Sequence, residues 1–235
     1  VPSWHESGHK GIVFGEPLGE IHERNRGTHL SQMYFDKTNC DLFDQVRPIK
    51  WVDPSNPGEY DILVIGAGAG GLVTAASAKG RGAHVALIER GSLGGDCLNT
   101  GCVPSKAFLK CCNVAHSARN AEQFGVIIKS VEIDFKAIMD RMKKIRADIA
   151  ENDSAERFST NMGVDLYLGH AKFVSKNEVE INGKTLKFLK ACIATGGRPF
   201  VPTIEGLSEV EFHTSDSIFN LEKLPESMLV LGCGP

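Results

Sequence analysis

The pattern of hydrophobic and polar positions changes sharply at the end of the first quarter of the chain. Residues 1–58 are polar, rich in Gly, His and Asn, and weakly periodic, and their last part, WVDPSNPGEY (51–60), contains turn-forming residues typical of a linker. A short strand of the buried type at 62–65 then precedes a Gly-rich turn, a helix over 72–79 and a second strand over 84–89. A strand, a helix and a strand in this order predict a βαβ unit with a parallel strand pair.

Helical spacing dominates the middle of the chain. Residues 105–125 predict a helix that ends at Gly125, and residues 134–163 predict one long amphipathic helix or two, ending at Gly163. The apolar face expected for the first comprises Phe108, Cys112, Ala115 and Ala118 or Arg119. The apolar face expected for the second comprises Ile138, Met142, Ile145 and Ile149.

Strand patterns return in the last third. Residues 164–174 predict a strand pair or one bent strand, and 178–197 predict a hairpin turning at Asn182-Gly183. Residues 227–235 (SMLVLGCGP) predict a further strand that leads into a Gly-rich turn. The fold expected is therefore α/β: a three-layer, Rossmann-like domain on a parallel sheet, with inserted helices and a small antiparallel element.

Composition narrows the class of protein. The 235 residues are 42% hydrophobic and 23% charged, with a formal net charge of -3, which is typical of a soluble globular protein of one or two domains. This charge argues against a nucleic-acid partner, and no apolar run approaches the roughly 20 residues of a membrane span. The seven cysteines are odd in number and unevenly spread, so an intracellular location (cytoplasm, mitochondrion or plastid) is expected rather than secretion. The chain begins at Val1, so we expect that its natural start is missing.

The Gly-rich turn fits the G-x-G-x-x-G fingerprint of a dinucleotide site. Gly66 allows the tight turn, Gly68 lets the backbone approach a pyrophosphate, and Gly71 lets the helix pack close to the strand. The turn follows a strand, opens a helix, and is followed by Glu89 at the end of the next strand, so the context is right. The Glu89 carboxylate would accept hydrogen bonds from ribose hydroxyls and disfavours a 2′-phosphate, which indicates FAD or NAD here.

Directly after this unit, GGDCLNTGCVPSK (94–106) contains Cys97 and Cys102 with four residues between them. No further Cys or His flanks the pair as a zinc site would require, so no metal ligand is expected. A structural disulfide and two unrelated thiols stay open, but a redox pair explains more of the context. Cys102 is expected near a helix N-terminus, where the helix dipole and Lys106 would favour its thiolate.

The motifs GAGAGGL…E, GGDCLNTGCVPSK and ATGGRP, in this order, resemble the class I pyridine nucleotide-disulfide oxidoreductases over residues 60–235. Asp96 before the first cysteine and a second fingerprint beginning G-x-G-P are similar to the mercuric-reductase branch. The resemblance implies that Cys97 attacks substrate, that the Cys102 thiolate lies against the flavin of FAD, and that Lys106 stabilises the reduced flavin. NAD(P)H would load the flavin with electrons, which pass to a Cys97–Cys102 disulfide.

The resemblance also implies which residues bind FAD, how the chain is divided and what it acts on. The cofactor-binding residues expected are Gly66, Gly68, Gly71, Glu89, Arg90, Gly95, Asp96, Lys106, His170, Ala171, Thr195, Gly196 and Arg198. Residues 1–58 would be an extension and linker, 59–226 the FAD-binding domain, and 227–235 the start of an NAD(P)-binding domain. The substrate would be a small disulfide or a metal ion, with mercuric ion reductase and dihydrolipoyl dehydrogenase as alternatives, and the full-length protein a homodimer. This chain by itself is expected to bind FAD without turnover.

Overall fold

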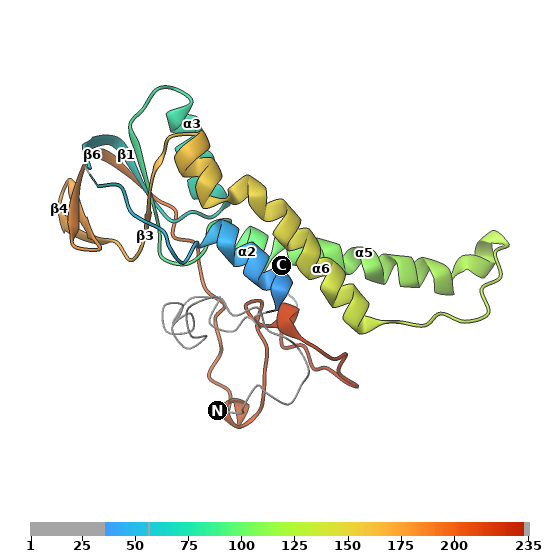
Figure 1. Ribbon diagram of the computed structural model, residues 1–235. Helices are drawn as coiled ribbons and strands as arrows, with labels where there is room; N and C mark the ends of the chain where they lie inside the picture. The colour runs from blue at the N-terminus through green and yellow to red at the C-terminus, as the bar shows by residue number, and fades with distance from the viewer. Residues whose placement is uncertain (1–35, 56, 233–235) are drawn as a thin grey trace, which may run out of the picture.

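A six-stranded, mostly parallel sheet forms one end of the molecule, and two long helices extend away from it (Figure 1). The computed structural model describes residues 36–55 and 57–232. The strands are β1 (Glu59–Ile65), β2 (Val85–Glu89), β3 (Asp165–Leu168), β4 (Lys172–Ser175), β5 (Glu178–Ile181) and β6 (Lys184–Ile193). The α/β class predicted from the sequence is confirmed.

The order of the strands is β3-β2-β1-β6-β5-β4. β3, β2, β1 and β6 run parallel, whereas β5 and β4 continue the sheet in antiparallel fashion. β6 joins the two parts, because its start pairs with β5 and its end pairs with β1. The predicted hairpin turn is present at Asn182 and Gly183, both with positive φ (48° and 74°), as a two-residue turn of this kind requires.

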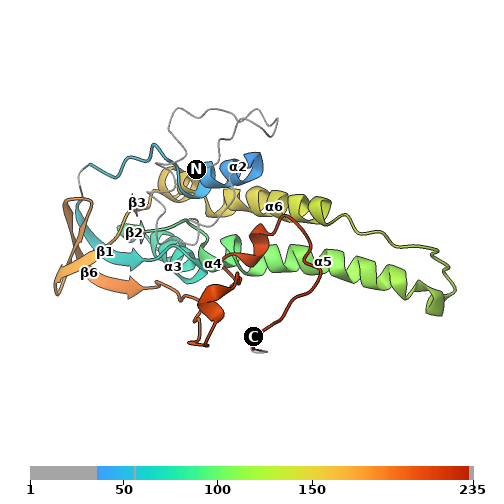
Figure 2. The same ribbon diagram turned by 90° about the horizontal axis from the view of Figure 1, so that it is seen from below.

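The helices alternate with the strands and then form a long hairpin. They are α2 (Lys37–Val46), α3 (Ala69–Lys79), α4 (Gly95–Asn99), α5 (Cys102–Arg119) and α6 (Phe135–Ala150). Short helical turns are η2 (Ala121–Phe124), η3 (Glu151–Asp153), the π-helical η4 (Arg157–Asn161), η5 (Leu207–Glu209) and η6 (Ile218–Asn220). Figure 2 shows α5 and α6 side by side, and the two helices are in contact. Both glycines predicted to end the helical stretches, Gly125 and Gly163, adopt positive φ (78° and 70°).

Apolar side chains cover both faces of the sheet. On one face, Val64 and Leu87 pack with residues of α2, α3 and the end of α6. On the other, Leu63 and Ile88 pack with Tyr60 and with the antiparallel strands. Since neighbouring residues of a strand point to opposite faces, this division accounts for the continuous apolar runs of β1 and β2.

The apolar faces predicted for the two long helices are wrong in detail. On α5, Pro104 and Ala107 are buried and Cys112 is exposed. On α6, Ile149 is exposed. The buried residues of α6 are Met139, Met142, Lys143, Arg146, Ala147 and Ala150. Two cations therefore lie on the buried face of α6, a position that a hydrophobic pattern assigns to apolar residues.

The segment before β1 is part of the fold. It forms helix α2 and then runs beside β3, where the Trp51 indole nitrogen donates to the Leu166 carbonyl at 3.2 Å. The Asp53 carboxylate accepts from the Leu168 backbone nitrogen at 3.2 Å. The sequence pattern did not predict α2, and residues 1–35 of the predicted extension lie outside the described residues.

The strand predicted at 227–235 is not formed in residues 227–232, and residues 233–235 lie outside the described part. Its apolar side chains are exposed, Leu229 by 84% and Val230 by 73%. A strand needs a hydrogen-bonded neighbour, and none of the strands in residues 36–55 and 57–232 pairs with this stretch. The limits 59–226 and 227–235 remain a prediction.

Candidate active site

The carboxyl ends of the four parallel strands bring most of the predicted site residues to one edge of the sheet (Figure 1). Gly66 follows β1 directly, Glu89 ends β2, and His170 and Ala171 come shortly after β3. Thr195 and Gly196 follow β6 at the same edge. This edge is where open parallel sheets bind their ligands.

The Gly-rich turn is closed by backbone contacts that exclude side chains. Gly66 has φ +101°, and a Cβ built on it would lie 2.2 Å from the Ala194 carbonyl oxygen. A Cβ on Gly71 would lie 1.7 Å from the Gly66 oxygen. Any side chain at these two positions would overlap the backbone, so both must be glycine, as the fingerprint predicts. Gly66 also allows the end of β1 to approach the segment that contains Thr195.

The cysteine-containing loop lies directly against this turn. Gly68 pairs with Gly94 as an isolated β-bridge, and the Gly94 nitrogen donates to the Ala67 carbonyl at 2.8 Å. A Cβ on Gly95, whose φ is +54°, would lie 2.6 Å from the Gly68 Cα. The two motifs that the sequence keeps 20 to 30 residues apart are thus in direct backbone contact.

The side chain of Glu89, at the end of β2, hydrogen-bonds to the Gly-rich turn and to the start of the segment that leads to the cysteines. One carboxylate oxygen accepts from the Ala67 nitrogen at 2.6 Å and the other from the Gly91 nitrogen at 2.5 Å. Each oxygen uses one lone pair in this way and keeps another for a ligand hydroxyl. The role of Glu89 in holding a ribose stays a prediction, and its two bonds to backbone nitrogens add a structural role that the sequence did not indicate.

The two cysteines lie on different helices. Cys97 is in α4 and Cys102 is the first residue of α5, with a break at Gly101, where a Cβ would lie 2.9 Å from the Asp96 carbonyl oxygen. Both cysteines are free thiols in the structure. The predicted place of Cys102 at a helix N-terminus agrees with α5, and Pro104 lies in its first turn.

The surroundings of Cys97 favour its protonated form. Its pKa is raised, first by the hydrogen bond that its thiol shares with Cys102, then by burial and by the negative charges of Cys102 and Asp153. Lys106 acts in the opposite direction. Asp153, in η3, is a residue that sequence reasoning missed, since it lies some 50 positions from the motif. Burial also raises the pKa of Asp153, against the opposing charge of Arg157.

Asn99 is a second missed residue, although it stands inside the cysteine motif. Its side chain is fully buried, and its amide nitrogen donates to the Leu93 carbonyl at 3.1 Å and to the Gly95 carbonyl at 2.8 Å. These bonds fold the loop back on itself around Cys97. Its place between the two cysteines is the signal that could have identified it.

The remaining predicted residues lie around this core with fewer constraints. Arg90, Asp96, Lys106 and His170 are exposed. Arg198 makes an ion pair with Asp216 at 3.4 Å, on the segment after β6.

The geometry fits a dinucleotide. The N-terminus of α3 follows Gly68, which makes no side-chain cap, so the first backbone N–H groups of the helix are available to a pyrophosphate. A Cβ added at Gly66, Gly71 or Gly95 would overlap the backbone atoms that face it. Among the residues that the structure describes, no group of three or more His, Cys, Asp or Glu side chains is placed to hold a metal ion. None of the helices in that part of the chain has the length and apolar character of a membrane span.

Known proteins share these features. The family model described as "Pyridine nucleotide-disulphide oxidoreductase" matches residues 60–235. A mercuric reductase of Lysinibacillus sphaericus is 34% identical over 191 residues, which cover 81% of this chain and 35% of the relative. A dihydrolipoyl dehydrogenase of Acholeplasma laidlawii is 38% identical over 181 residues, 75% of this chain and 53% of the relative.

A solved structure, the HOCl-induced flavoprotein disulfide reductase RclA from Escherichia coli, superposes with a TM-score of 0.57 at 26% identity, covering 71% of this chain and 35% of that one. The chain thus spans about a third to a half of the length of these relatives. The resemblance inferred from the fingerprint and the cysteine motif is confirmed. With the matched family model, the sheet and the paired thiols in agreement, the chain belongs to the pyridine nucleotide-disulphide oxidoreductases, whose cofactors are FAD and NAD(P)H.

Proposed function

We propose that the protein containing this chain is an FAD-dependent oxidoreductase that passes electrons from NAD(P)H, through Cys97 and Cys102, to a disulfide or related substrate. The observation that carries this proposal is the contact between the two motifs. Two interacting thiols lie in the segment 94–106, whose backbone at Gly95 touches the dinucleotide fingerprint at Gly68.

The two cysteines can reduce a disulfide by successive exchange. The Cys97 thiolate attacks one sulfur of the substrate and forms a mixed disulfide, which releases the first product thiol. Cys102 then attacks the Cys97 sulfur, releases the second thiol, and closes a Cys97–Cys102 disulfide. The substrate has gained two electrons and two protons. To return to thiols, the pair needs two electrons from NAD(P)H and two protons, one carried by the hydride and one taken from solvent. All steps are reversible, so reduction potentials set the direction.

The residues that would hold FAD are those of the strand-end edge. Gly66, Gly68 and Gly71 with the start of α3 would bind the pyrophosphate, and Glu89 the adenosine ribose. FAD supplies the hydride chemistry that links NAD(P)H to a thiol pair. We further assign the segments at His170-Ala171 and Thr195-Gly196 to this site, because both follow strands at that edge.

The two thiols differ in their surroundings, which favours separate roles. Cys97 lies in the short helix α4, while Cys102 lies at the positive end of the 18-residue helix α5, with Lys106 one turn further along. We therefore assign attack on substrate to Cys97 and electron exchange with the cofactor to Cys102.

The substrate class rests on the relatives. Mercuric reductases and dihydrolipoyl dehydrogenases are both similar to this chain at 33% to 38% identity, so reduction of a metal ion and oxidation of a dithiol are the two specific alternatives. We also propose, from the family resemblance, that the full-length protein is an intracellular homodimer.

The thiolate–flavin assignment can be tested on the full-length protein loaded with FAD. After reduction by two electrons, long-wavelength charge-transfer absorbance should appear in the wild type and be lost in Cys102→Ser. Cys112→Ser, an exposed cysteine on the same helix, is the matched control and should keep the band. A wild-type spectrum without this band, or a band that survives Cys102→Ser, would refute the assignment.

A further inference from the structure

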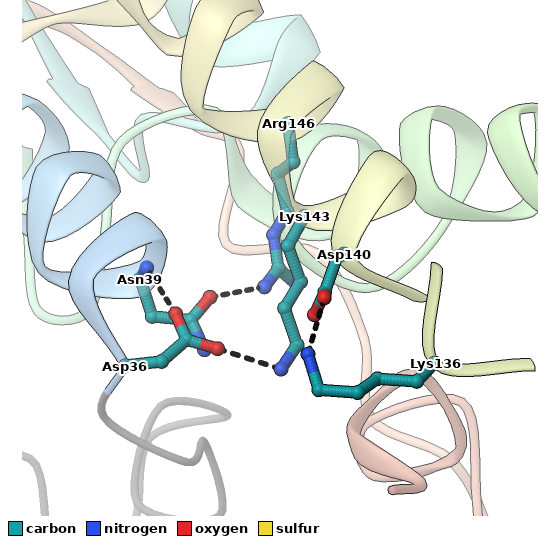
Figure 3. Close-up of polar contacts among 6 residues, drawn as sticks. All are labelled: Asp36, Asn39, Lys136, Asp140, Lys143 and Arg146. Atoms are coloured by element: carbon teal, nitrogen blue, oxygen red, sulfur yellow. Dashed lines mark hydrogen bonds and ion pairs between the residues drawn. The ribbon is translucent and has the colours of Figure 1, made fainter. Parts of the chain in front are cut away.

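Two cations, Lys143 and Arg146, lie on the buried face of α6, next to the segment that contains the two cysteines. Arg146 is 1% exposed and Lys143 is 9% exposed. Burying a charged side chain costs free energy unless partners replace its water. The partners of both cations come from elements distant in sequence, namely the start of α2 (Figure 3) and the end of α4.

Arg146 connects α6 to the loop that separates the two thiols. Its Nη1 donates to the backbone carbonyl of Asn99 at 2.8 Å, and its Nη2 donates to the Asn39 side-chain oxygen at 2.6 Å. Asn99 is the last residue of α4, between Cys97 and Cys102. One guanidinium therefore bonds the turn of the redox pair and the helix before β1 at the same time. We call Asn39, Asn99 and Arg146 the clamp.

The start of α2 is fixed on α6 by a separate set of contacts. The Asp36 carboxylate caps α2 by accepting from the Asn39 nitrogen at 2.8 Å, and also pairs with the Lys143 ammonium at 2.7 Å (Figure 3). Further along, the Gln45 amide donates to the Ala147 carbonyl at 3.1 Å. Asn39 is itself 1% exposed, so its side-chain oxygen has a fixed position from which to hold Arg146.

Burying the polar groups of the clamp costs free energy. The Arg146 Nε and the Asn99 Oδ1 are buried and have no hydrogen-bond partner among the described residues. Burial also lowers the pKa of Arg146 to about 10, although the Asp36 charge opposes this, so the side chain is a cation at neutral pH. Buried ion pairs are often replaced by apolar residues without loss of stability. The contacts of Arg146 are therefore weak evidence for a purely stabilising role.

We propose that Arg146 is a positioning residue for the redox pair: it holds the turn at Asn99–Gly101, and α2 fixes it through Asn39. This inference rests on the proposed function, in which Cys97 and Cys102 alternate between thiols and a disulfide. α2 is then the element that sets how readily the pair closes.

The expected effect follows from the geometry of a disulfide. Two cysteines can bridge when their Cα atoms lie about 4.4–6.8 Å apart, and α4, the break and the start of α5 set that separation. When the Asn99 carbonyl is released, the turn samples more conformations and the effective concentration of one thiol near the other falls. We expect the equilibrium constant for disulfide closure to fall about tenfold, which corresponds to about 30 mV for a two-electron couple.

A glutathione titration of the 235-residue chain measures this constant without cofactor or turnover. The pair gives two electrons and two protons to oxidised glutathione, which becomes two thiols. Trypsin releases the peptide 91–106, GSLGGDCLNTGCVPSK, which contains Cys97 and Cys102 and no other cysteine. Mass spectrometry after thiol alkylation therefore gives the oxidised fraction directly, whatever the state of the other cysteines.

Four variants separate positioning from stability. Arg146→Met removes the guanidinium of the clamp, and Asn39→Leu removes the amide oxygen that accepts from it. Each variant should shift the reduction potential of the Cys97–Cys102 pair towards more oxidising values. Asn39→Asp keeps an acceptor oxygen for Nη2 and should restore the wild-type potential. Lys136→Met is the matched control on the same helix, because Lys136 makes an exposed ion pair with Asp140 and lies outside the clamp (Figure 3).

The outcomes distinguish the two proposals. If the wild type closes the Cys97–Cys102 disulfide and both Arg146→Met and Asn39→Leu have the wild-type reduction potential, the clamp has no positioning role, whatever the melting temperatures of the variants. The proposed function then still stands. If wild type closes no Cys97–Cys102 disulfide across the titration, the proposed function fails and the clamp proposal fails with it. A shift in both variants, with the wild-type value in Asn39→Asp and Lys136→Met, supports the clamp.

Discussion

Replacing Gly71 by alanine should break the turn that receives the dinucleotide phosphates. The new Cβ would lie 1.7 Å from the Gly66 carbonyl oxygen and 2.9 Å from its carbon, where real Cβ contacts stay beyond 3.0 Å. Both contacts are with backbone atoms, so no side chain can rotate away. Helix α3 would have to move from β1 by an ångström or more.

The cost of that movement follows from how α3 is packed. Leu72 and Ala75 are buried on its inner face, 5% and 0% exposed, and any shift of the helix disturbs their contacts with the sheet. Overpacking of a close-packed site costs about 3 kcal/mol at the upper end of its usual range. For a chain of this size that loss lowers the melting temperature by about 6–12 °C.

The neighbouring Gly70→Ala is the matched control. A Cβ at Gly70 would meet nothing within 4 Å, and the residue is exposed on the same helix. Alanine is a better helix former than glycine, so this variant should gain up to about 1 kcal/mol.

Thermal unfolding followed by circular dichroism and FAD titration followed by flavin fluorescence together test the Gly71 prediction. If the strained turn must close to bind the pyrophosphate, Gly71→Ala should weaken FAD binding by up to about 100-fold. Equal melting temperatures and equal FAD affinities for Gly71→Ala and Gly70→Ala would show that the close approach of α3 to Gly66 is not required.

Two further predictions concern the charges at the site. Because the pKa of Cys97 is raised, its thiol should stay protonated to higher pH than an ordinary thiol, and its alkylation by iodoacetamide should start at higher pH. The Cys97 thiol stabilises the folded state fully below the pKa of an ordinary thiol, and this contribution is lost as the pH rises through the raised pKa of the folded state. Asp153→Asn should move the alkylation profile to lower pH and Lys106→Gln to higher pH, and identical profiles in both would contradict the charge assignment. Glu89→Gln should remove one of the two bonds that the carboxylate accepts from backbone N–H groups, costing about 1–2 kcal/mol in thermal unfolding and weakening FAD binding, and an unchanged melting temperature would exclude that structural role.

The part of the fold that the sequence predicted is the part set by local rules. The strand–turn–helix–strand unit from β1 to β2 follows from apolar runs and from glycines that only a tight turn requires. The Asn182-Gly183 hairpin and the stop glycines, Gly125 and Gly163, are likewise determined by backbone conformation at single positions. The cysteine pair was recognised because its spacing and its place after the fingerprint are both local.

The residues that were missed depend on contacts between distant segments. Asp153 acts on Cys97 from the end of the α6 region, and nothing near it in the sequence indicates a thiol. Helix α2 has few apolar residues, and its strongest local signal is the Asp36 cap, which is common in turns as well. Trp51 and Asp53 were interpreted as part of a linker because turn residues surround them, yet both bond the edge of β3.

The apolar face of α6 shows why a hydrophobic pattern fails in such a place. A periodicity argument counts Lys143 and Arg146 as solvent-facing, and so rotates the predicted face towards Ile145 and Ile149. The rotation is wrong because the partners that allow these cations to be buried, Asp36 and Asn39, lie more than a hundred residues earlier. A polar contact of this kind can be recognised only when the positions of both segments in the fold are known. The misassigned face of α6 and the missed helix α2 are therefore the same error, and both elements lie next to the segment that contains the two thiols.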